Sequence, residues 1–178
     1  MHAAGLFDAS SPTALRLAVF EVYDAATIAR GDAFVQESLV SGLVPIGGDR
    51  SGDRWCFDTR VRIGGTIPIL ACPHDGGGAT YAAPSFAGFV YAQLLENVLY
   101  TERFASGRDG LDREGVRRLT LEHLERLDRW LLRRWGRRAK AMLEGKWPTH
   151  RAFGSWLRED RSFARLPRAE LDHFRPDA

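Results

Sequence analysis

The sequence predicts an α+β protein: an antiparallel meander sheet packed by helices, with a carboxyl-terminal helical extension. Three observations predict this class. Short apolar runs separated by glycine-rich turns fill residues 43–73, which is typical of a meander. Apolar residues then recur at helical spacing over 85–104 and 115–144. Finally, 178 residues of which 44% are apolar suffice for one buried core.

The amino-terminal elements are the least clearly marked. Residues 1–14 are small and polar, so we expect a disordered or loose leader. Alternation of Leu15, Leu17 and Val19 predicts a strand within 14–24. The segment 25–42 is ambiguous, because its alanine-rich start favours a helix while its centre also fits a short second element.

Glycine turns divide the meander. The apolar runs lie at 43–46, 54–58, 61–63 and 66–72. The sequence GGDRSGD and the pair Gly64-Gly65 separate these runs and are predicted to form tight turns. Glycine adopts the positive φ that such turns require, and Asp and Ser side chains form hydrogen bonds with the local backbone. Pro68 indicates an edge position or a bulge. We expect 74–84 to be a flexible loop.

Helices make up the remainder. Ser85 is a natural N-cap for a helix over 85–104. The segment 115–144 predicts one amphipathic helix about 45 Å long, and a shorter helix follows near 149–158. We therefore expect an α+β core over 15–104 and a helical extension over 105–178 packed on it.

Motifs for catalysis are absent from the sequence. There is no Gly-x-Gly-x-x-Gly, phosphate-binding P-loop, His-Glu-x-x-His or Cys-x-x-Cys. The run His74-Asp75-Gly76-Gly77-Gly78 is similar to an esterase oxyanion loop, but no Gly-x-Ser-x-Gly accompanies it. The five histidines show no paired spacing. We expect neither an enzyme nor a cofactor.

A metal site was considered for four carboxylates: Asp49, Asp53, Asp58 and Asp75. These side chains would hold a hard cation if they converged at one end of the meander. The turn lacks the spacing of a calcium loop, and Arg50 and Arg54 in the same stretch would repel a metal. Hairpin chemistry is the preferred interpretation, and no metal is expected.

Cys56 and Cys72 indicate the compartment. Both fall in predicted strands, and if those strands are neighbours the thiols could pair. The preferred interpretation is two buried, reduced thiols, which fit a reducing compartment. The sequence also has no apolar run long enough to span a membrane. We therefore expect a cytoplasmic protein without membrane association.

Charge is divided unevenly along the chain. Residues 1–112 carry eight basic and thirteen acidic side chains, whereas 113–151 carry twelve basic and five acidic. The candidate basic surface comprises Arg133, Arg134, Arg137 and Arg138, with Trp130 and Trp135 interleaved. Arginines that solvate the outer face of a packed helix are the preferred interpretation, and nucleic-acid binding through the basic helix 115–144 ranks below it.

Residues 43–98 contain an ordered series of short motifs: a hydrophobic-Pro-hydrophobic-Gly step, a Gly-Asp turn, an aromatic strand ending in Asp, a strand entering an acidic loop and a Ser-Phe helix start. The positions that form them are Pro45, Gly47, Asp49, Gly52, Asp53, Trp55, Asp58, Pro68, Asp75, Ser85 and Phe86. In this series the chain resembles the SUKH superfamily, which includes the yeast cell-wall synthesis regulator and many bacterial immunity proteins. The chain resembles a divergent member that lacks the usual amino-terminal Leu-Pro-x-x-aromatic motif.

This resemblance implies an immunity protein that binds and neutralises a cognate toxin. The predicted contacts are Asp49, Arg50, Asp53, Trp55 and Asp75. The acidic excess of the sheet half would suit a basic partner. Two alternatives are a non-enzymatic regulatory or scaffold protein, including a homodimer joined through the long helix, and the nucleic-acid binder described above.

Overall fold

The computed structural model describes residues 17, 21–23, 28, 42–75, 78–100, 110–145 and 149–167. They belong to two compact units, each described by itself. The sheet unit draws on residues 20–89 and 156–167, and the helical unit on 90–155. The predicted leader, most of the predicted strand at 14–24 and nearly all of the ambiguous segment 25–42 lie outside the described residues.

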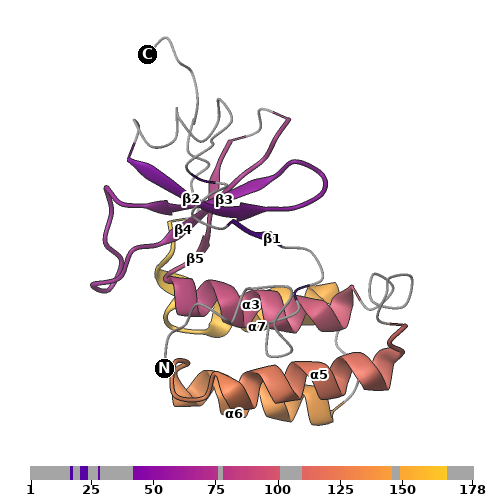
Figure 1. The fold of residues 1–178 in the computed structure, drawn as a ribbon. Coiled ribbons are helices and arrows are strands. Elements are labelled where there is room, and N and C mark those ends of the chain that lie inside the picture. The colour runs from indigo at the N-terminus through magenta and orange to yellow at the C-terminus, as the bar shows by residue number, and fades with distance from the viewer. Residues whose placement is uncertain are drawn as a thin grey trace. The chain divides into compact units, whose positions relative to one another are not determined.

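Five antiparallel strands form the sheet in the order of the sequence (Figure 1). They are β1 (Glu21–Val22), β2 (Leu43–Gly48), β3 (Arg54–Asp58), β4 (Ile69–Cys72) and β5 (Thr80–Ala83). Each strand pairs with its neighbour in the chain, because the intervening segments reverse direction without crossing the sheet. The predicted α+β class and the antiparallel meander are confirmed.

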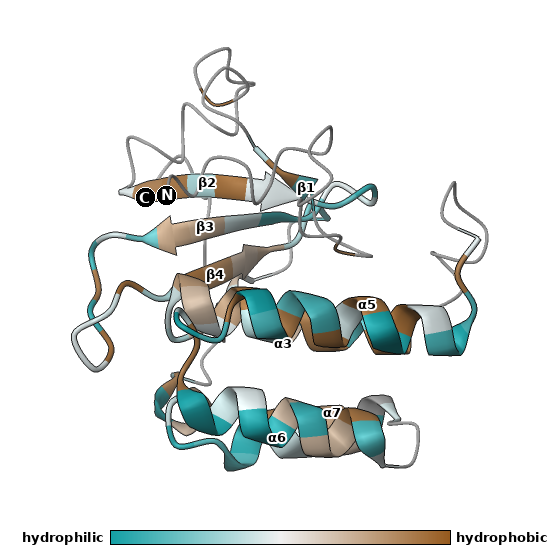
Figure 2. Cartoon of the chain, turned by 60° about the horizontal axis from the view of Figure 1, so that its bottom comes forward, coloured by the Kyte–Doolittle hydropathy of each residue, from teal (hydrophilic) through white to brown (hydrophobic). Residues whose placement is uncertain are grey.

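Alternation along β3 gives the sheet two different faces. Cys56 lies opposite Leu70, on the face of a buried cluster of Leu43, Cys56, Leu70, Cys72 and Ala79, against which Tyr81 packs. Trp55 and Phe57 point to the other face. There the ring of Phe57 lies 5.7 Å from that of Phe86 at the start of α3 (Phe86–Leu99). Figure 2 shows apolar colouring along much of β2 and β4.

Two details of the meander differ from the sequence prediction. Residues 61–63 form no strand; a single bridge joins Ile63 to Thr66 around Gly64 and Gly65, whose φ angles are 60° and 83°. β4 lies between β3 and β5, so the edge position suggested by Pro68 is wrong. A register shift between Ile69 and Leu70 agrees with the alternative of a bulge.

The segment 74–84, predicted as a flexible loop, contains strand β5. Its sequence Thr-Tyr-Ala-Ala includes two alanines, which have low strand propensity. The strand forms because its backbone pairs with β4 and because Tyr81 packs on the buried cluster. Tertiary contacts therefore override the local preference.

The helix α3 begins as predicted. The Ser85 hydroxyl accepts a hydrogen bond from the Gly88 backbone N–H at 3.1 Å, which satisfies one of the unpaired N–H groups of the first turn. Residues 88–95 are all buried. A helix that is buried on every side needs apolar residues around its circumference, and FAGFVYAQLLENVL supplies them.

The predicted single helix over 115–144 is instead two helices, α5 (Arg113–Arg126) and α6 (Arg133–Glu144). The buried positions after 124 follow one another in steps of four: Leu127, Leu131, Trp135, Ala139 and Leu143. In a straight helix each such step advances about 40° past a full turn, so the four steps between these five residues would spread them over about 160°. The chain breaks at Leu132, which has extended backbone angles (φ −64°, ψ 130°), and each segment then keeps a narrow apolar side.

The two segments form an antiparallel hairpin (Figure 1). Arg117 near the start of α5 donates from Nη2 to the carbonyl oxygen of Gly145 after α6, at 3.5 Å. In the helical unit the rings of Tyr91 and Trp135 stack at 5.1 Å with an interplanar angle of 13°. The predicted terminal helix is confirmed as α7 (His150–Glu159) and is followed by the 3₁₀ turn η2 (Phe163–Arg165).

Two tryptophans five residues apart provide a matched test of this hairpin. Trp135 is 2% exposed and Trp130 is 60% exposed. Replacing Trp135 by alanine is expected to lower the free energy of unfolding by about 3–5 kcal/mol, because it leaves a cavity beside Tyr91. Trp130→Ala should change it by no more than about 0.5 kcal/mol. Urea denaturation followed by circular dichroism measures both; equal losses would show that the α5–α6 break is misplaced.

Candidate functional site

Four of the five predicted contact residues gather at one end of the sheet. Asp49, Arg50 and Asp53 lie in the turn between β2 and β3, and Asp75 follows β4. Because neighbouring strands are antiparallel, the end of β2, the start of β3 and the end of β4 lie at the same end of the sheet. We call Asp49, Arg50, Asp53, His74 and Asp75 the turn cluster.

Asp49 organises the β2–β3 turn. Its Oδ1 accepts hydrogen bonds from the Ser51 backbone N–H at 2.9 Å, the Ser51 hydroxyl at 2.7 Å and the Asp53 backbone N–H at 3.0 Å. A carboxylate that bonds to the backbone two and four residues ahead holds a turn in one conformation. The hairpin interpretation of GGDRSGD therefore agrees with the geometry.

Asp53 links this turn to the loop after β4. Its Oδ1 accepts from the His74 backbone N–H at 3.0 Å and lies 2.8 Å from His74 Nδ1. Gly52 permits the approach: its φ is 103°, and a Cβ there would lie 3.1 Å from the Cβ of His74. Two turns distant in sequence are thus joined by one carboxylate.

The two partners shift each other's pKa. The hydrogen bond to Asp53 raises the pKa of His74 above its ordinary 6.5, and the charges of Asp53, Asp75 and Asp49 act in the same direction. Hydrogen bonds from the His74 side chain and backbone lower the pKa of Asp53 below 3.8. Below pH 6.5 the cluster therefore contains an exposed imidazolium held against a carboxylate.

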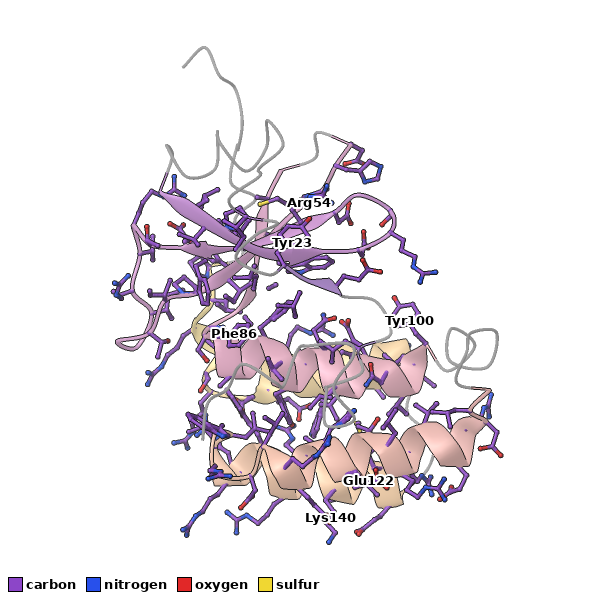
Figure 3. All side chains as sticks on the ribbon, in the orientation of Figure 1. Tyr23, Arg54, Phe86, Tyr100, Glu122 and Lys140 are labelled. Atoms are coloured by element: carbon purple, nitrogen blue, oxygen red, sulfur yellow. The ribbon has the colours of Figure 1, made fainter. Side chains whose placement is uncertain are left out.

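Charges at this end of the sheet are mixed. Arg54 lies over the ring of Tyr23 at 5.8 Å (Figure 3) and donates from Nη1 to the Gly52 carbonyl at 3.0 Å. Arg50 forms an exposed pair with Glu21 at 3.6 Å. Residues 42–75 hold four Asp and four Arg. The acidic excess expected for residues 1–112 is thus not located in this described part of the sheet unit.

Trp55, the fifth predicted contact, stands apart from the other four. It lies within β3 and is half-buried, with its ring 6.1 Å from that of Phe89. Phe89 in turn stacks near Phe86. Trp55 therefore belongs to an aromatic cluster with Phe86 and Phe89 and lies outside the turn cluster.

Asp58 is separated from the other aspartates by the length of β3. It is fully buried, and its carboxylate is held by Arg60 through Nε at 2.8 Å and Nη2 at 3.0 Å. The Tyr81 hydroxyl donates to Oδ2 at 3.1 Å. The four carboxylates considered for a cation do not converge, and the described residues hold no group of three or more potential metal ligands.

Cys56 and Cys72 are buried thiols on neighbouring strands, and no disulfide joins them. They lie on the same face, since Cys56 pairs with Leu70 and Cys72 with Arg54. A hydrogen bond with the Cys56 side chain lowers the pKa of Cys72, although burial opposes the change. The strands are neighbours, as the sequence left open, and the thiols pack as small apolar side chains.

The candidate basic surface is on α6 in the helical unit. Arg133, Arg134 and Arg137 are exposed and Arg138 is half-buried. Arg134 lies 5.6 Å from the centre of the Trp135 ring. The two tryptophans of this region differ, because Trp135 belongs to the core whereas Trp130 is exposed.

Sequence reasoning missed His74 and Glu96. The sequence does not mark His74 as functional, because no histidine has a partner at short spacing and Asp53 is 21 residues away. Glu96 lies on α3, where burial raises its pKa to about 7 despite a hydrogen bond from Gln93. No local pattern marks either one, because each depends on its tertiary surroundings.

Comparisons with known proteins found no family model, no curated protein and no solved structure that matches the chain. In the described part of the chain, no helix is long and apolar enough to cross a membrane.

The Asp53–His74 pair makes a prediction about pH. Asp53→Asn should return the pKa of His74 toward 6.5, because it removes the charge that stabilises the imidazolium. The raised pKa of His74 adds stability below 6.5 that is lost at higher pH, and the lowered pKa of Asp53 adds stability above 3.8 that is lost in acid. The pair therefore stabilises most between these values. NMR titration of His74 measures the shift; an unchanged pKa in the variant would contradict it.

A second prediction concerns Asp58. Asp58→Asn should cost about 1.5–3 kcal/mol of unfolding free energy, because it weakens the charge-assisted bonds to both Arg60 and Tyr81. Tyr81→Phe removes only one of these bonds and should cost less. Burial is the largest single influence on the Asp58 pKa and raises it. The hydrogen bonds and charge of Arg60, with the hydrogen bond of Tyr81, outweigh burial, so the net pKa lies below 3.8. The stability that the ionised Asp58 carboxylate contributes is therefore lost as pH falls below 3.8. Denaturation at neutral and acid pH tests both; Asp58→Asn no worse than Tyr81→Phe would contradict it.

Proposed function

We propose that the protein is a binding protein of the immunity type, which neutralises a cognate toxin by contact through the turn cluster. One observation carries the proposal: residues from two separate loops converge at one exposed end of the sheet and are held there by Asp49 and Asp53. A surface fixed before binding loses little conformational entropy in the complex. The resemblance of residues 43–98 to SUKH proteins supports the class of partner.

The charges define what this surface offers. It presents the carboxylates of Asp49, Asp53 and Asp75 beside the guanidinium of Arg50 and the imidazole of His74. Arranged charges of both signs give specificity and set the association rate more than they set affinity. A partner with a basic patch flanked by one carboxylate is complementary to this pattern. His74 adds sensitivity to pH, since the hydrogen bond to Asp53 raises the pKa at which its imidazole gains a charge.

The test uses isosteric variants of the full chain. Asp49→Asn with Asp53→Asn keeps side-chain oxygens that accept hydrogen bonds and removes two negative charges. The tagged wild-type chain should retain one stoichiometric partner from its native cells after nuclease treatment. The purified partner should bind the double variant about tenfold more weakly, chiefly through slower association.

Glu122→Gln with Glu125→Gln is the matched control, because both side chains are exposed on α5 and the charge change is the same. The partner's toxicity should be neutralised by wild type and control but less well by the turn-cluster variant. Equal neutralisation by all three would place the binding surface elsewhere. A retained partner without toxicity would refute the immunity role itself.

A further inference from the structure

The turn between α5 and α6 exposes two large apolar side chains. Trp130 is 60% and Leu132 is 43% exposed, and they are the exposed large hydrophobic residues in the part of the chain that the structure describes. An indole in water forgoes a large burial energy. Nearby Leu127, Leu131 and Trp135 are all buried, so this segment buries its other large apolar side chains and leaves Trp130 and Leu132 exposed.

A row of cations begins directly after this turn. At 100° per residue, Arg133, Arg137 and Lys140 fall within about 60° of one another around α6, opposite the buried Trp135. All three are exposed, and Lys140 is labelled on α6 in Figure 3. No ion pair with another described residue neutralises them. The helix contains one acidic residue, Glu144, at its last position.

The first turn of α6 adds positive potential to this row. Its N-cap, Leu132, makes no side-chain hydrogen bond, and no acidic residue follows in the first turn. By contrast, α5 is capped by Asp112, which accepts from the Gly115 N–H at 2.8 Å. Arg133 thus lies at the positive end of the helix dipole, where a bound anion is stabilised.

We infer that this surface binds single-stranded nucleic acid. The surface, called here the basic face, comprises Trp130, Arg133, Arg134, Arg137 and Lys140. A row of cations beside an exposed aromatic ring is the combination that binds a phosphate backbone and stacks an unpaired base. Like charge disfavours a second copy of the same face. A membrane surface would require a broader apolar face than two side chains, and that of α6 is buried.

The test is fluorescence anisotropy of a labelled oligothymidylate of about 20 nucleotides titrated with the full chain. If four cations contact phosphates, the logarithm of affinity should fall with that of salt with a slope of about −2.8, which is roughly 50-fold between about 50 and about 200 mM. Arg133→Gln with Arg137→Gln should reduce the slope by about 1.4. Trp130→Ala should weaken binding by a factor of roughly 5 to 150 and leave the slope unchanged.

Arg118→Gln with Arg151→Gln is the charge-matched control, since both side chains are exposed outside the basic face. Trp130→Phe keeps an aromatic ring and should restore most of the affinity lost in Trp130→Ala. Three results would each overturn the inference: no binding at low salt, equal losses in the control pair, or Trp130-dependent binding to phosphatidylserine vesicles without binding to the oligonucleotide. The turn cluster is unchanged in these variants, so the result is independent of the proposed immunity role.

Discussion

The sheet unit depends on one buried carboxylate. Asp58 ends β3 fully buried, and such a charge is tolerated only when it is paired and hydrogen-bonded. Its side chain accepts from Arg60 and Tyr81, its backbone N–H donates to the Pro68 carbonyl at 3.0 Å, and it lies opposite Leu43 of β2. One residue therefore connects β2, β3, β5 and the loop before β4, and the strands that carry the turn cluster are fixed from their far end.

Local rules predicted the features that neighbouring residues determine. The Asp49 turn and the Ser85 cap were predictable because each side chain bonds within four residues of itself. The Asp53–His74 link was not, since it joins positions far apart in sequence. The same reason explains β5, whose alanines form a strand only beside β4. The break after α5 was missed because neither glycine nor proline marks it; it follows from the burial of Leu131 and Trp135 on either side of Leu132.

The two units present different electrostatic surfaces although the whole chain has a net charge of only +2. In the turn cluster, charges of opposite sign lie within hydrogen-bonding distance, which fixes geometry and short-range specificity. On α6, exposed basic side chains recur at Arg133, Arg137 and Lys140, which produces a field that extends to about the Debye length. The first kind of surface selects a partner by fit, whereas the second attracts any polyanion. Composition alone averages over this distinction.

The last strand of the meander has a consequence for behaviour at high concentration. An edge strand with unpaired backbone groups is a template for aggregation through intermolecular strand pairing. β5 is the edge of the sheet beyond β4 and is only four residues long. Pro84 follows it directly and has no N–H to offer an incoming strand. The same brevity that concealed β5 from sequence analysis thus limits how far a second molecule can extend the sheet at this edge.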